Sequence, residues 1–209
     1  MCKLIARRLG FTYLDTGAMY RAMTWWVLHE GIDVQDPVTL AARAAEPSIV
    51  VSTDPDRAHV EVDGHDVTEE IRSPDVTHAV SWVSAVPEVR ARLLEVQRRA
   101  MAEGGIVVEG RDIGTVVAPD APVKVFLVAS TQARAARRAA DWAHHDVTVE
   151  DTHASLERRD ALDSTREISP LTRAEDAVEI DSTEHSLDEV VDEVVGLVLA
   201  RTAAGGGAQ

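Results

Sequence analysis

Residues 14–21 hold the first group of side chains whose types and spacing suit phosphate chemistry. Their sequence, LDTGAMYR, follows a short apolar segment and opens a helix at Asp15, Thr16 and Gly17. The first turn of a helix presents backbone N–H groups to an anion, and Arg21 lies one turn further on, within reach of a phosphate. Taken alone, the pattern is better explained by an ordinary helix cap followed by a surface arginine.

Residues 108–117, with the sequence VEGRDIGTVV, place charges of both signs in a glycine-flanked loop after a second apolar run. Glu109, Arg111 and Asp112 form the arrangement expected where the charges of Mg²⁺ and of phosphate groups must both be met. A structural salt bridge would explain the local pattern about as well.

Residues 158–166, with the sequence RRDALDSTR, form the third group. Arg159, Asp163 and Arg166 follow one another at spacings of four and three, so a helix would place them on one face. Solvated ion pairs are the commoner explanation of such spacing on an isolated helix.

The elements that must position these groups are those of an α/β protein. Continuous apolar runs at 106–109 and 123–129 predict parallel strands that are covered on both faces, and residues 49–52 and 59–62 predict an antiparallel hairpin. Further strands are predicted at residues 11–14, 66–67 and 177–181. Helices are predicted at residues 3–9, 16–30, 132–143, 149–159 and 187–199, and after the Asp-Pro, Ser-Pro and Val-Pro pairs that end at Pro37, Pro74 and Pro87.

Composition excludes several classes of protein. The 209 residues carry a formal net charge of −15, which argues against binding to nucleic acid. Cys2 is the only cysteine, so an intrachain disulfide is excluded and a reducing compartment is expected. No apolar run approaches a membrane span, and the first residues lack the pattern of a signal peptide. These features predict a cytoplasmic protein that contacts neither nucleic acid nor membrane.

Together with residues 120–127 (DAPVKVFL), the three stretches closely resemble the bacterial cytidylate kinases, and the resemblance follows almost the whole chain in order. It implies a P-loop nucleoside-monophosphate-kinase-like α/β fold, with a parallel sheet, helices on both faces and a small β-rich CMP-binding insert. The expected boundaries are a kinase domain at 1–202, with the insert at about 31–100 and a short lid at about 138–150, and a disordered tail at 203–209.

The resemblance also implies the substrates, which are CMP or dCMP with ATP and Mg²⁺, and a monomeric enzyme without a metal site of its own. A carboxylate that accepts from the cytosine amine would select against uracil, which presents an acceptor there. The residues implied around cytosine are Thr16, Ser81, Arg90 and Asp112; those for the monophosphate are Arg21, Arg111 and Arg166; those for the sugar are Arg159 and Asp163. Arg111, Arg166 and Asp112 are the implied catalytic residues, and Arg134, Arg137 and Arg138 resemble the arginines that lead into the lid over ATP.

One element of the family pattern is not found. Kinases of this class carry a strand followed by G-x-x-x-x-G-K-[S/T], and nothing in the 209 residues matches it. We therefore predict that the strand between those at 106–109 and 123–129 is missing, that the protein begins upstream of Met1, and that the chain as written folds poorly. The alternative is a non-catalytic CMP-binding or regulatory protein that has lost ATP binding. A hydrolase using His144, His145 and His153 lacks the expected spacing of metal ligands.

Overall fold

The computed structural model describes residues 1–141 and 171–205. These divide into two compact units, one of residues 2–113 and one of residue 1 with residues 114–209. The predicted helix at 149–159 lies outside the described residues. The predicted CMP-binding insert, at about 31–100, falls within the first unit.

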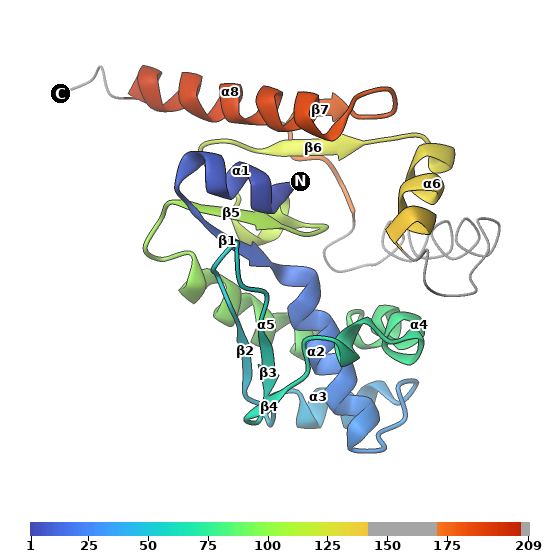
Figure 1. Cartoon of the computed structure of the whole chain (residues 1–209). Helices are drawn as coiled ribbons and strands as arrows, with labels where there is room; N and C mark the ends of the chain where they lie inside the picture. The colour runs from blue at the N-terminus through green and yellow to red at the C-terminus, as the bar shows by residue number, and fades with distance from the viewer. Residues whose placement is uncertain (142–170, 206–209) are drawn as a thin grey trace. The chain divides into compact units, whose positions relative to one another are not determined.

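The first unit combines helices with short strands (Figure 1). Its elements are α1 (Cys2–Leu9), β1 (Thr12–Asp15), α2 (Thr16–His29), α3 (Pro37–Arg43), β2 (Ile49–Val51), β3 (Val60–Val62), β4 (His65–Asp66), the 3₁₀ turn η1 (Glu70–Arg72), α4 (Pro74–Val83), α5 (Pro87–Ala100) and β5 (Ile106–Glu109).

Capping signals in the sequence explain where the helices of this unit begin and end. The Asp36 carboxylate accepts hydrogen bonds from the backbone N–H groups of Val38 and Thr39, each at 3.1 Å, and Pro37 follows as the first helical residue of α3. Ser73 caps α4 in the same way. Gly31, at φ +66°, follows the end of α2 in a left-handed conformation that favours glycine. The predicted starts at Pro37, Pro74 and Pro87 are confirmed.

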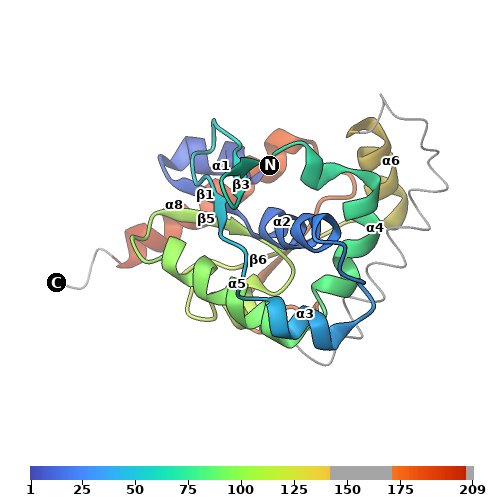
Figure 2. The same ribbon diagram turned by 90° about the horizontal axis from the view of Figure 1, so that it is seen from below.

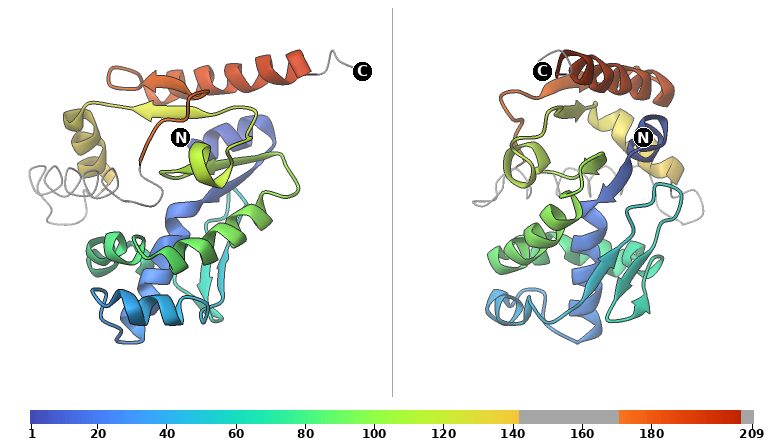
Figure 3. Two further views of the ribbon diagram at one scale, coloured as in Figure 1. Left: turned by 180° about the vertical axis from the view of Figure 1, so that it is seen from behind. Right: turned by 90° about the vertical axis from the view of Figure 1, so that its left-hand side faces the viewer.

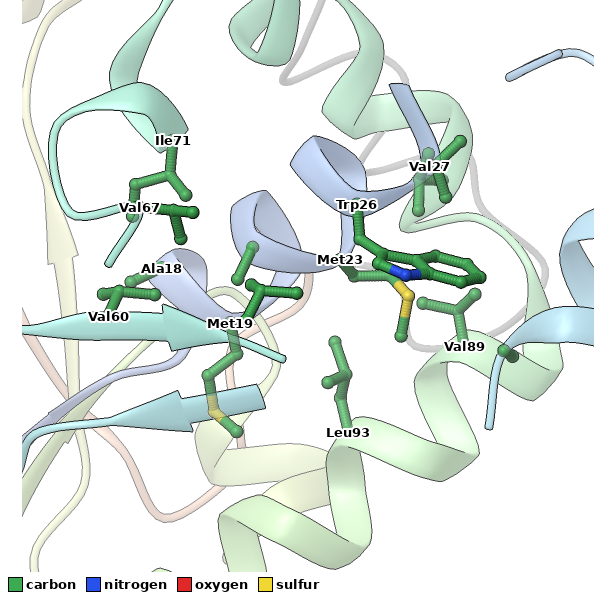
Figure 4. Close-up of a cluster of buried hydrophobic side chains, with 14 of the residues drawn as sticks. Ala18, Met19, Met23, Trp26, Val27, Val60, Val67, Ile71, Val89 and Leu93 are labelled. Carbon is green, nitrogen blue, oxygen red and sulfur yellow. The ribbon is translucent and has the colours of Figure 1, made fainter. Parts of the chain in front are cut away.

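Helix α2 forms the centre of the first unit. Figure 2 shows it with α4 on one side and α5 on another, and it also packs against β2, β3 and η1. Met19, Met23 and Trp26 project from α2 toward Val89 and Leu93 of α5 (Figure 4), and all five side chains are buried. This packing fixes the helix that carries Thr16, predicted for cytosine, in its first turn and Arg21, predicted for the phosphate, one turn further on.

Two small sheets complete the first unit. Strands β1 and β5 pair in parallel, with Asp15 opposite Glu109 at their carboxyl ends. Strands β2, β3 and β4 form the predicted antiparallel meander, in the order of the chain.

The second unit contains a second parallel pair, β6 (Val125–Val128) with β7 (Val178–Asp181). Helix α6 (Thr131–Asp141) follows β6, and α8 (Leu187–Gly205) runs along the strands in Figure 3, with Val190 and Val191 buried. Helix α8 is longer than predicted, because the Ala-rich residues after Thr202 favour helix, so residues 203–205 of the expected tail are helical. The π-helical turn η2 (Ile113–Val117), at the boundary between the units, was not predicted.

The predicted α/β class with parallel strands is confirmed by these two pairs. Among the residues that the structure describes, β5 pairs only with β1, and β6 only with β7. The missing central strand stays a prediction. Within the same residues, no helix is long and apolar enough to cross a membrane.

Candidate functional site

Functional groups of the first unit gather where β1 and β5 end side by side. Asp15, the last residue of β1, accepts a hydrogen bond from the backbone N–H of Ala18 at 3.0 Å and so caps α2. The buried Thr16 hydroxyl donates to the backbone carbonyl of Glu109 at 2.7 Å. These contacts join the 14–21 stretch to the 108–117 stretch, as expected for ligand-binding loops at the carboxyl ends of parallel strands.

A cluster of titratable side chains surrounds Glu109. The Tyr13 hydroxyl donates to the Glu109 carboxylate at 2.5 Å. Burial and this hydrogen bond raise the pKa of Tyr13, and burial followed by the charge of Glu109 raises the pKa of Cys2. Burial also raises the pKa of Asp15, and the neighbouring Glu109 adds to this effect. Tyr13 and Cys2 therefore remain protonated at neutral pH beside a carboxylate pair.

The most deeply buried charges of the site belong to Arg90 of α5 and Asp112 of the loop after β5. Their exposed fractions are 7% and 6%, and Nη2 of Arg90 pairs with the Asp112 carboxylate. Nη1 of Arg90 donates to the backbone carbonyl of Ser84 at 3.1 Å. Its buried Nε has no hydrogen-bond partner among the described residues. A buried donor without a partner is costly, so this edge of the guanidinium is a candidate contact for a ligand.

Arg21 is held by residues that precede and open α4. Its Nη1 donates to the backbone carbonyl of Ile71 at 3.1 Å and to the Thr77 hydroxyl at 2.9 Å. The positive charges of Arg72 and Arg21 also oppose the rise in the pKa of Asp15, so both guanidinium groups act on this end of the strands. Such a group of arginines suits a phosphate.

The close approach of the two loops depends on Gly110. A Cβ atom there would lie 2.4 Å from Oγ1 of Thr16 and 2.7 Å from Cδ1 of Ile113. Only glycine leaves room for Thr16 to contact the β5 loop at this point.

The structure connects most of the sequence-predicted residues that lie in the first unit. The Ser81 carbonyl accepts from the Ser84 hydroxyl at 3.3 Å, and Ser84 in turn holds Arg90. Arg111 lies between Gly110 and Asp112 in the same loop. Thr16 reaches the same loop by donating its hydroxyl to the backbone carbonyl of Glu109, the residue before Gly110.

The predicted lid arginines lie on α6 of the second unit. Arg137 donates to the hydroxyl of Ser182 at 3.0 Å and to the carbonyl of His185 at 3.4 Å, so its guanidinium ties α6 to the turn after β7. Arg134 approaches the Thr131 hydroxyl. The side chain of Arg138 is not described, and Arg159, Asp163 and Arg166 lie outside the described residues.

Sequence reasoning missed several side chains that shape the site. Tyr13 and Ser84 act through contacts with Glu109 and Arg90 that no local spacing indicates. Tyr20 was within the 14–21 stretch, but an aromatic residue on an apolar helix face is more often part of a core. Its ring lies against Arg90, with the guanidinium carbon 5.3 Å from the ring centroid.

A parallel α/β framework, with arginines and carboxylates near the carboxyl ends of its strands, is consistent with the nucleoside monophosphate kinase class. The sequence profile of the cytidylate kinase family matches residues 1–200, and the chain belongs to that family. It is similar to the cytidylate kinase of Streptomyces avermitilis, with 52% identity over 97% of this chain and 87% of that protein. The cytidylate kinase of Limosilactobacillus fermentum is 44% identical over 95% of this chain and 88% of that protein. A bifunctional pantoate ligase/cytidylate kinase of Synechococcus elongatus is 46% identical over 93% of this chain, which covers 38% of that longer protein.

Proposed function

We propose that this protein transfers the γ-phosphoryl group of ATP to CMP or dCMP, giving ADP with CDP or dCDP. The phosphate oxygen of the monophosphate attacks in line, and catalysis comes from positioning and from charge stabilisation rather than from a covalent enzyme intermediate. Membership of the cytidylate kinase family supports this proposal.

The observation that carries the choice of base is the buried Arg90–Asp112 pair. Cytosine presents an amine donor at position 4 beside a ring nitrogen that accepts, whereas uracil presents a carbonyl and an N–H. A carboxylate next to a guanidinium whose buried Nε has no hydrogen-bond partner among the described residues offers an acceptor for the cytosine amine and a donor for the ring nitrogen. Uracil would place its carbonyl oxygen against the Asp112 carboxylate, and such a mismatch at a buried polar site is strongly disfavoured.

We further propose that Arg21 and Arg111, together with Arg166, bind the monophosphate, and that Arg159 and Asp163 bind the sugar. The contacts of Arg21 with Ile71 and Thr77 would hold its guanidinium ready for the phosphate before the nucleotide arrives. Arg134 and Arg138 are proposed to face ATP. Arg137 already contacts Ser182 and His185, so it would serve this region by fixing α6.

Magnesium is proposed to enter as part of the ATP complex. Within the described part of the chain, no three His, Cys, Asp or Glu side chains are grouped so that they could hold a metal ion. Mg²⁺ in kinases is commonly held by substrate phosphates with one or two carboxylates, and Asp15 and Glu109 are the carboxylates nearest to the strand ends.

The test of base choice compares two arginines of α5. Arg90→Met should weaken CMP binding at least tenfold, because charge-assisted hydrogen bonds contribute about 1.5–3 kcal/mol each. The matched control is Arg92→Met, whose side chain is one-third exposed and pairs with Glu95 at 3.9 Å. Titration calorimetry with CMP, dCMP, UMP and AMP measures both. Equal affinity of the unmodified chain for all four nucleotides would refute the proposed base recognition.

A second function is favoured by one observation, which is that the 209 residues contain no G-x-x-x-x-G-K-[S/T] motif. The chain would then bind CMP without phosphorylating it. Coupled ADP release with CMP and Mg-ATP separates the two functions. Turnover supports the kinase, and CMP binding without turnover supports a binding or regulatory role for these residues.

A further inference from the structure

Arg90 is restrained by three different elements of the first unit. The carbonyl of Ser84, directly after α4, accepts from Nη1, and Asp112, in the loop after β5, pairs with Nη2. The guanidinium carbon lies over the ring of Tyr20, on α2, at 5.3 Å from the ring centroid. The first two contacts are hydrogen bonds from the terminal nitrogens of the guanidinium, whereas in the third the cation lies over the face of an aromatic ring.

These contacts restrain different motions. With its two terminal nitrogens held by hydrogen bonds, the guanidinium can still rotate about the line that joins the Ser84 oxygen and the Asp112 carboxylate. A ring that faces the cation opposes this rotation, because the attraction is largest when the guanidinium lies over the face of the ring. Without the ring, the guanidinium, with its unpartnered Nε, could tilt out of the plane in which it would meet a base.

We propose that Tyr20 is a positioning residue that sets the plane of Arg90 and thereby contributes to the choice of cytosine over uracil. This inference rests on the proposed recognition of the base by Arg90 and Asp112. A guanidinium held in one plane donates well to the ring nitrogen of cytosine. A guanidinium free to tilt can also turn a donor toward the carbonyl of uracil. The Tyr20 ring would therefore weaken the binding of UMP as well as strengthen the binding of CMP.

The test measures the ratio of the UMP and CMP dissociation constants in the 209-residue chain, which requires no ATP. Tyr20→Leu should lower this ratio about five- to thirtyfold, because cation–π contacts at desolvated sites contribute about 1–2 kcal/mol. Tyr20→Phe keeps the ring and should retain the ratio within about twofold of the unmodified chain. Tyr20→Gln is a second ring-free variant for the case in which the leucine variant does not fold.

Trp25→Leu is the matched control, because Trp25 lies on the same helix and stacks on His29 rather than on Arg90. It should leave the ratio unchanged. Urea unfolding of every variant reports any loss of stability separately from the ratio.

The outcomes separate this inference from the proposed function. An unmodified chain that does not prefer CMP would refute the base recognition on which the inference rests. A chain that prefers CMP, and keeps that preference in folded Tyr20→Leu or Tyr20→Gln, would refute the role of Tyr20 alone. Loss of the preference in Tyr20→Phe would assign the effect to the hydroxyl and contradict the role of the ring.

Discussion

Gly110 is a residue at which the two strand-end loops approach each other closely. Because a Cβ atom there would lie 2.4 Å from the Thr16 hydroxyl oxygen, Gly110→Ala must displace a short, buried side chain from its hydrogen bond with Glu109. Overpacking of this kind costs about 1–3 kcal/mol. We expect the free energy of unfolding in urea to fall by this amount, and CMP to bind more weakly in calorimetry.

Gly196 provides the control for this substitution. It lies within α8, and a Cβ atom there would meet nothing within 4 Å. Gly196→Ala should therefore stabilise the chain by about 0.5–1 kcal/mol through helix propensity. Equal effects of the two substitutions would show that the crowding at Gly110 is not what limits the site.

Gln97 of α5 is a buried amide. Its exposed fraction is 1%, and neither Oε1 nor Nε2 has a hydrogen-bond partner among the described residues. Gln97→Met keeps the length of the side chain and removes both polar atoms, so the free energy of unfolding should rise by about 1–3 kcal/mol. Gln35→Met, at an exposed position, should change it by less than about 0.5 kcal/mol. Loss of stability in Gln97→Met would mean that the amide has partners outside the described residues.

Helix α3 depends at its N-terminus on a carboxylate that must be ionised. The hydroxyl and then the backbone N–H of Thr39, followed by the N–H of Val38, lower the pKa of Asp36 below its ordinary value of 3.8. Because the folded state depresses this pKa, the cap stabilises the protein above pH 4 and loses its effect as the pH falls through the folded pKa. Asp36→Ala should thus be less stable than the unmodified chain at pH 7, and the difference should disappear toward pH 2.

The thermal midpoint, measured from pH 7 down to pH 2, checks this dependence on the cap. Asp36→Asn is the matched control, because asparagine caps a helix about as well as aspartate and does not titrate. A stability difference between the alanine variant and the unmodified chain that is the same at both pH values would contradict the assignment.

Elements were predictable where the signal is local. Asp36-Pro37 and Ser73-Pro74 begin helices through contacts within three residues, and the apolar run at 106–109 is a strand by composition alone. The π-helical turn η2 has no such signal. Arg90 and Asp112 were predicted to act together by family resemblance. Their pairing across 22 residues, and the Ser84 carbonyl that orients them, arise from packing that no spacing encodes.

At the scale of the whole molecule, β5 and β6 each pair with a strand on one side only among the described residues, so each has an outer edge of four residues without a strand partner there. The backbone groups on those edges of β5 and β6 are a template for further pairing. A single strand that lay between them would join the pairs into one five-stranded sheet. The predicted poor folding of these 209 residues, their monomeric state and their cytoplasmic location stay predictions.

A chain extended at its N-terminus by an apolar strand and a G-x-x-x-x-G-K-[S/T] loop tests both the sheet and the proposed kinase activity. The strand should raise the urea midpoint, because each new backbone hydrogen bond contributes about 0.5–1.5 kcal/mol, and the loop should allow ADP release with CMP and Mg-ATP. The same extension with alanine in place of the loop lysine should keep the gain in stability and lose most of the turnover. If the extended chain unfolds at the midpoint of the 209-residue chain, then β5 and β6 do not flank a common strand. If the extended chain is also as inactive as the 209 residues alone, the binding role without phosphoryl transfer is the one that the chain performs.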